Sequence, residues 1–195
     1  MPLLSILICT LPGRARTFFP KVLDQLRPQY EHNAAVELLY LGDNKTMTVG
    51  EKRNWLVRMA KGEYVVFVDD DDRVATDYVA TLLGGITLQQ DKGIRPDVVC
   101  FHAEIRINGS APAPVYYAAK FGRDQNPPGK YLRIPNHLMC VRRALALETP
   151  YAHVSRGEDA DYARRLLPKL AIEHLLPKTL YYYDFDAATT EAQKP

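Results

Sequence analysis

Apolar residues in the first hundred positions gather in short continuous runs, separated by segments in which they recur every three or four residues. The runs cover residues 3–10, 36–41, 64–68 and 97–101, and they predict strands that are buried on both faces of a sheet. The segments between them, at 17–30, 48–60 and 76–86, predict helices. This alternation predicts an α/β fold with a central, mostly parallel sheet flanked by helices.

The second half of the chain has a different pattern. Residues 103–107 alternate between apolar and polar, Asn108-Gly109 is a turn signal, and 115–117 is the expected return strand. These features predict a small antiparallel element. Residues 131–141 predict one or two further strands, and 179–183 the last one. We expect one domain over residues 1–195, with halves at about 1–95 and 96–186 and a polar tail at 187–195.

Helix starts are marked by residues that accept hydrogen bonds from free backbone N–H groups. Thr17 is the expected cap of the first helix. Thr48 with Glu51, and Ser155 with Glu158, both have the spacing of a capping box.

Composition excludes several broad classes. With 25 Lys and Arg against 23 Asp and Glu, the net charge of +2 does not indicate nucleic-acid binding. The three cysteines lie apart in apolar stretches without zinc-site spacing, so we expect buried thiols in a reducing, cytoplasmic protein. No signal peptide is expected, because the N-terminus has no basic region. No apolar run approaches the roughly 20 residues of a transmembrane segment.

Four consecutive carboxylates, Asp69–Asp72, follow the third apolar run directly. Ligands of open parallel sheets bind beyond the carboxyl ends of the strands, which is where these side chains are expected. Adjacent carboxylates repel each other, and a divalent cation with oxygen ligands relieves that repulsion. The alternative is a solvated acidic loop, because Asp is common in turns.

Basic residues also follow a predicted strand and lie at the start of a predicted helix. Arg14 and Arg16 follow the first strand, where they suit a phosphate or a base, or else belong to an exposed loop. Lys52, Arg53 and Asn54 lie in the first turns of the second helix, so they suit an anion or form a solvated helix face.

Taken together, these motifs resemble the GT-A-fold glycosyltransferases of the large inverting family 2. The stretches that carry the resemblance are ILICT in the first strand, Asp43-Asn44 after the second, GEKRN at 50–54, GEYVVFVDDDD at 63–72 and GED at 157–159. It covers about residues 3–167. It implies a Rossmann-like fold whose first half binds a nucleotide-sugar donor, with a UDP-sugar as the leading expectation, and whose second half meets the acceptor.

The resemblance also implies roles for particular residues. In the donor site Thr10 would lie by the nucleoside, Asp43 would accept a hydrogen bond from the base, and Arg53 would lie near base or phosphate. Asp69 and Asp71 match the DxD motif, which contacts the ribose and a Mn²⁺ or Mg²⁺ ion. Asp70 and Asp72 offer an alternative register of that motif. His137 is a further candidate ligand.

Asp159 matches the catalytic base, which removes the proton from the attacking hydroxyl. Glu158 and Arg142 would lie on the acceptor side, although the structural alternative for Glu158 is helix capping. The acceptor remains open among a glycan, a lipid-linked sugar, a protein and a modified nucleic acid.

Two other functions remain open as well. A nucleotidyltransferase shares a related α/β sheet and an acidic metal site, and Pro12–Arg16 faintly resembles its glycine-rich loop. The other is a non-catalytic module that binds a carbohydrate or a nucleotide.

Overall fold

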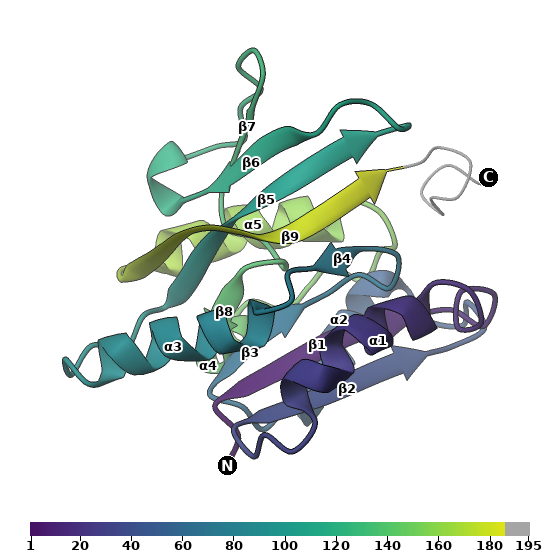
Figure 1. Cartoon of the computed structure of the whole chain (residues 1–195), viewed down its shortest axis with the longest axis horizontal. Helices are drawn as coiled ribbons and strands as arrows, with labels where there is room; N and C mark the ends of the chain where they lie inside the picture. The colour runs from purple at the N-terminus through teal and green to yellow at the C-terminus, as the bar shows by residue number, and fades with distance from the viewer. Residues whose placement is uncertain (186–195) are drawn as a thin grey trace.

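The computed structural model describes residues 1–185 and contains a single mixed sheet between two layers of helices (Figure 1). The strands are β1 (Leu4–Thr10), β2 (Val36–Gly42), β3 (Tyr64–Phe67), β4 (Arg73–Val74), β5 (Val98–Ile107), β6 (Ala113–Tyr117), β7 (Tyr131–Arg133), β8 (Cys140–Arg142) and β9 (Glu173–Phe185). The α-helices are α1 (Phe19–Tyr30), α2 (Val49–Met59), α3 (Tyr78–Gln90), α4 (Arg143–Leu147) and α5 (Glu158–Leu166). The predicted tail at 187–195 lies outside the described residues.

The sheet has the order β2-β1-β3-β8-β5-β6-β7, with β9 paired to β5 and β4 paired to β9. Strand β1 is parallel to β2 and β3, and β5 is parallel to β9. Strand β8 is antiparallel to both β3 and β5, so β3 and β5 run in the same direction. The five strands β1, β2, β3, β5 and β9 therefore all point the same way, which confirms the predicted α/β fold with a mostly parallel sheet.

The predicted antiparallel element is also present. Strands β5 and β6 form a hairpin-like pair with Ile105 opposite Ala113. Asn108 and Gly109 take positive φ angles of 49° and 74°, as a tight turn between antiparallel strands requires.

Helices cover both faces of the sheet. Helix α1 contacts α3 on one face, whereas α2 contacts α4 and α5 on the other (Figure 1). Strand β3 is buried along its whole length, and so is the first half of β5. This burial explains the continuous apolar runs in the sequence. Within residues 1–185, no helix has both the length and the apolar composition that crossing a bilayer requires.

Of the three helix caps predicted from the sequence, the structure contains one. The Thr48 hydroxyl accepts a hydrogen bond from the N–H of Glu51, and the Glu51 carboxylate accepts one from the N–H of Thr48, which confirms that capping box. The cap predicted at Thr17 is wrong, because α1 begins one residue later, with Phe18 as its N-cap. The Thr17 hydroxyl instead donates to the carbonyl oxygen of Gly13, at 3.4 Å.

The second predicted capping box is also wrong. The N-cap of α5 is Gly157, whose φ of 76° suits glycine, and no side chain caps this helix. Because Ser155 is not the cap, the carboxylate of Glu158 is available for a partner outside its own helix.

Helix α2 is held close to the segment that precedes α5. A Cβ atom at Gly50 would lie 1.8 Å from the carbonyl oxygen of Ala152, so only glycine allows this approach. The amide of Asn54 also exchanges two hydrogen bonds with the backbone of Tyr151, at 2.9 and 2.8 Å. Together these contacts bring the basic side chains of α2 beside α5.

Candidate active site

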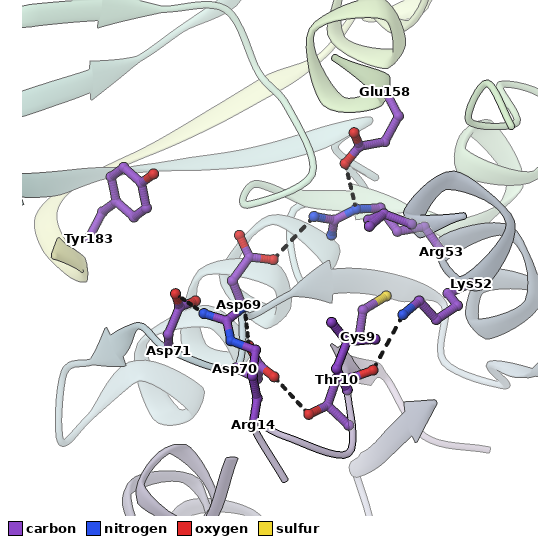
Figure 2. Close-up of a pocket in the computed structure, with 12 residues that line it drawn as sticks. Cys9, Thr10, Arg14, Lys52, Arg53, Asp69, Asp70, Asp71, Glu158 and Tyr183 are labelled. Atoms are coloured by element: carbon purple, nitrogen blue, oxygen red, sulfur yellow. Dashed lines mark hydrogen bonds and ion pairs between the residues drawn. The ribbon is translucent and has the colours of Figure 1, made fainter. Parts of the chain in front are cut away.

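A cavity of about 210 Å³ opens beyond the carboxyl ends of β1 and β3. Its walls come from the end of β1, the start of α2, the acidic run, and single residues of α5 and β9. The lining residues are Cys9, Thr10, Leu11, Arg14, Val49, Lys52, Arg53, Asp69, Asp70, Asp71, Glu158 and Tyr183 (Figure 2). We call it the first cavity.

The four carboxylates of Asp69–Asp72 do not point to one common centre. Asp70 accepts a hydrogen bond from the Thr10 hydroxyl at 2.7 Å and pairs with Arg14 at 3.0 Å. Asp71 pairs with the other terminal nitrogen of Arg14. The Arg14 guanidinium thus lies between these two carboxylates, as Figure 2 shows.

The outer two members of the run have other partners. Asp69 pairs with Arg53 at 3.1 Å and lies 3.3 Å from Nε2 of His137. Asp72 is 3% exposed and accepts a 2.6 Å hydrogen bond from the Tyr181 hydroxyl, which itself accepts from the N–H of Asp69. The alternative of a solvated acidic loop is therefore wrong, because three of the four carboxylates have a cationic partner and the fourth is buried.

Burial and mutual repulsion shift the acidity of this cluster. Burial, together with the charges of Asp71 and Asp69, raises the pKa of Asp70 to about 6, although Arg14 and Thr10 oppose the change. The pKa of Asp71 is also raised by burial, and that of Asp72 lies well above its usual range. Burial alone would raise the pKa of Asp69 too, but Arg53 and His137 outweigh it and lower that pKa. The cluster therefore holds more acid groups than its local cations neutralise.

Lys52, Arg53 and Asn54 in the first turns of α2 are buried, so a solvated helix face is wrong for them. Lys52 pairs with Asp43 at 2.8 Å and donates to the carbonyl oxygen of Thr10 at 3.3 Å. Although partial burial opposes it, hydrogen bonds from Lys52 and from the N–H of Met47 lower the pKa of Asp43 to about 2. Asp43 holds Lys52 in place and is not among the lining residues.

Arg53 connects α2 to both β3 and α5. Its Nε lies 3.4 Å from Glu158 and its Nη2 lies 3.1 Å from Asp69 (Figure 2). Its guanidinium also lies over the ring of Phe67, at 4.8 Å. Glu158 is 5% exposed and pairs with Arg53 rather than capping α5. The capping alternative for Glu158 is therefore wrong.

A second cavity, of about 250 Å³, adjoins the first and shares Asp69 and Tyr183 with it. Its other lining residues are Asp72, Ala103, Ile105, Val115, Tyr117, Tyr131, Arg133, Asn136, His137, Leu138 and Asp159. The neighbours Glu158 and Asp159 thus face different spaces: Glu158 borders the first cavity and Asp159 the second. The partly exposed Asp159 carboxylate accepts a hydrogen bond from the N–H of Ala160, at 2.8 Å.

One expected residue lies elsewhere. Arg142 is on β8 opposite Tyr64, the first residue of β3, and it pairs with Asp97 at 2.5 Å. This is the amino end of β3, whereas the acidic run follows its carboxyl end. The structure therefore does not bring Arg142 to the acceptor side, which corrects that expectation.

A preassembled metal centre is not found among residues 1–185, since no three His, Cys, Asp or Glu side chains there are arranged to hold an ion. Asp69 and Asp71 both line the first cavity and supply the hard oxygen ligands that Mg²⁺ and Mn²⁺ take. His137 lines only the second cavity. The residues present thus fit an ion that obtains its other ligands from a bound substrate.

Tyrosines are the site residues that the sequence did not indicate. Tyr181 connects Asp69 to Asp72, Tyr183 borders both cavities, and Tyr117 and Tyr131 line the second. Alternation along β9 could have revealed two of them, because positions 181 and 183 of a strand share one face. Tyr182, between them, instead lies against Arg73.

Structures of S. aureus TarS share this fold. TarS 1–349 in complex with UDP-GlcNAc matches with a TM-score of 0.66 at 14% identity, over 95% of this chain and 59% of that one. Its complex with UDP gives 0.66 at 15% identity, over 96% and 61%. A structure of TarS gives 0.65 at 15% identity, over 96% and 37%.

This chain therefore spans about 60% of the TarS 1–349 structure. No protein-family model and no curated protein matches it. At such low identity, the likeness to TarS establishes the shared fold alone.

Proposed function

We propose that this chain is a metal-dependent, inverting glycosyltransferase of the GT-A type, related to family 2, that moves a sugar from a UDP-sugar to an acceptor hydroxyl. The observation that carries the proposal is the first cavity, which combines carboxylates and buried cations beyond the carboxyl ends of β1 and β3. The fold that surrounds it is shared with TarS, a protein crystallised with UDP-GlcNAc and with UDP.

The donor's diphosphate belongs in the first cavity under this proposal. Lys52 and Arg53 supply buried positive charge there, and the partly exposed Arg14 supplies a third cation. Charge-assisted hydrogen bonds from such groups are the strong interactions available to a phosphate. Thr10 would lie by the nucleoside. Asp43, which pairs with Lys52 in the structure, would lie by the base.

A Mn²⁺ or Mg²⁺ ion would be held by Asp69 and Asp71, with His137 as a further candidate. Such ions often take only one or two carboxylates and complete their coordination with substrate phosphates. When bound, the ion would neutralise charge on the departing diphosphate. Burial, and after it the neighbouring carboxylates, raise the pKa values of Asp70 and Asp71, and a bound cation would favour their ionised forms.

Asp159 is the proposed general base. It borders the second cavity, which shares Asp69 and Tyr183 with the first. A carboxylate there would take the proton of an acceptor hydroxyl as its oxygen attacks the anomeric carbon. The sugar's bond to the diphosphate breaks in the same displacement, which inverts the configuration and requires no protein nucleophile.

A thermal-shift screen of nucleotide sugars with Mn²⁺ tests donor binding, because a ligand that binds only the folded state raises the apparent stability. Product analysis then separates the candidate functions. Release of a nucleoside diphosphate from a sugar nucleotide supports a glycosyltransferase, and release of pyrophosphate from a nucleoside triphosphate supports a nucleotidyltransferase.

Asp71→Ala should abolish the Mn²⁺-dependent part of the shift, with Asp91→Ala beyond the end of α3 as the exposed control. An unchanged Mn²⁺ dependence in Asp71→Ala would contradict the metal assignment.

A further inference from the structure

The second cavity contains buried polar atoms that have no partner within the described chain. Oδ1 of Asp72 and Nδ1 of His137 are both buried and make no hydrogen bond. The two side chains are 3% and 6% exposed, and both line the cavity. An unpaired polar group is costly to bury, so these atoms indicate partners that a ligand would supply.

The rest of the lining is aromatic and aliphatic. Tyr117, Tyr131 and Tyr183 contribute rings, and Ile105 and Val115 contribute apolar side chains. A small cavity with apolar walls and a few convergent polar atoms is the usual form of a site for a small organic ligand. Hydroxyl groups, which both donate and accept, match an unpaired carboxylate oxygen and an unpaired imidazole nitrogen.

The charges of the cavity are unbalanced toward the acidic side. Asp69, Asp72 and Asp159 line it, whereas Arg133 is the only arginine or lysine among its lining residues within 1–185. Nη1 of Arg133 donates to the carbonyl oxygens of Gln125 and Leu132, its Nε lies 3.9 Å from Asp124, and its guanidinium lies over the ring of Tyr131. A phosphate or carboxylate in this cavity would therefore meet more carboxyl groups than cations, and Arg133 already uses its Nη1 within the protein.

We propose that the second cavity binds the acceptor through an uncharged sugar, and that it rejects acceptors whose reacting unit carries a phosphate or a carboxylate. This inference rests on the proposed glycosyltransferase function and names its acceptor class. Asp72 and His137 hold the hydroxyl groups of this sugar and so orient it. The tyrosine rings contact its apolar C–H faces, while Asp159 receives the reacting hydroxyl.

Saturation-transfer NMR on the whole chain, with UDP and the diamagnetic Mg²⁺ present, tests this inference. The probes are the methyl glycosides of glucose, galactose, mannose and N-acetylglucosamine, together with methyl glucuronide and glucose 6-phosphate. At least one neutral glycoside should bind about tenfold more tightly than either anionic probe. Equal or tighter binding of an anionic probe would overturn the proposal, and so would the absence of binding by every neutral one.

A charge placed in the cavity wall sharpens the test. Ile105→Lys should raise the affinity for methyl glucuronide about tenfold relative to methyl glucoside, whereas Ile107→Lys, two residues further along β5 and outside the lining, should leave the ratio unchanged. An unchanged ratio in a folded Ile105→Lys protein would contradict the electrostatic basis. UDP affinity, measured in the same samples, reports separately on the donor site. If the unmodified protein did not bind UDP, the proposed function would be contradicted, whereas the glycoside results would still test the second cavity.

Discussion

The two adjoining cavities share Asp69 and Tyr183, yet their polar groups are arranged in opposite ways. In the first, each carboxylate has a cationic partner, and Arg14, Lys52 and Arg53 hold the set in place. In the second, Asp72 and His137 keep unpaired atoms among tyrosine rings. In the first cavity, four carboxylates share two arginines, which suits a charged ligand with its counter-ion, whereas the second suits an uncharged ligand with many hydroxyl groups.

The largest effect should come from removing the proposed general base, Asp159, which lines the second cavity and not the first. Asp159→Asn should lower turnover by about 10²–10⁴-fold, the usual range for general-base catalysis, and leave donor affinity nearly unchanged. Steady-state rates together with UDP-sugar binding measure the two effects separately. Asp161→Asn, on the same helix but paired with Arg165, is the matched control. Unchanged turnover in Asp159→Asn would assign the base elsewhere.

Removing Arg53, the cation that pairs with both Asp69 and Glu158, should mainly lower the free energy of unfolding. Arg53→Met leaves Asp69 and the buried Glu158 without their partner, which costs about 3–5 kcal/mol of unfolding free energy when a buried pair is broken. Urea denaturation measures this loss. Arg58→Met, an exposed position on α2, should change stability by under about 1 kcal/mol. Equal losses in the two variants would show that the Arg53 contacts contribute little.

The pH dependence of stability should reveal the acid excess of the first cavity. The pKa of Asp70 is raised to about 6 in the folded protein from 3.8, so between these values the folded state holds more protons than the unfolded state. The contribution of Asp70 to the free energy of unfolding is therefore fully present below pH 4. It falls as the pH rises through 6, by up to about 3 kcal/mol.

Asp70→Asn should flatten the fall in unfolding free energy between pH 4 and 7, measured by urea denaturation at each pH. The exposed Asp24→Asn should retain the slope of the unmodified protein. A slope in Asp70→Asn equal to that of Asp24→Asn would show that Asp70 titrates in its ordinary range.

The smallest effect concerns Arg14, which lies between Asp70 and Asp71 and competes with any added cation. Arg14→Ala should raise the affinity of the donor-free protein for Mn²⁺ about fivefold, which corresponds to an ion pair of roughly 1 kcal/mol. Isothermal titration with MnCl₂ measures this change, with the exposed Arg16→Ala as the control. A lower affinity in Arg14→Ala would mean that Arg14 assists the ion instead of competing with it.

The fold was more predictable from the sequence than the site was. Strand positions followed from apolar runs, because residues buried on both faces must be apolar, and the Thr48–Glu51 box followed from local spacing. The ion pair between Arg53 and Glu158 joins residues 105 positions apart, and no local pattern encodes such a contact. The Ser155 box failed because Gly157, with its positive φ, forms the N-cap instead. The acidic run was located correctly, but the separate partners of its four members depend on packing between distant elements.

The insertion of β8 between β3 and β5 has a mechanical consequence. Its backbone hydrogen bonds continue the sheet from one half of the chain into the other, so the halves cannot swing apart about a flexible linker. Any movement that opens or closes the two cavities must then take place in the connections beyond the strand ends, because the sheet beneath them is continuous.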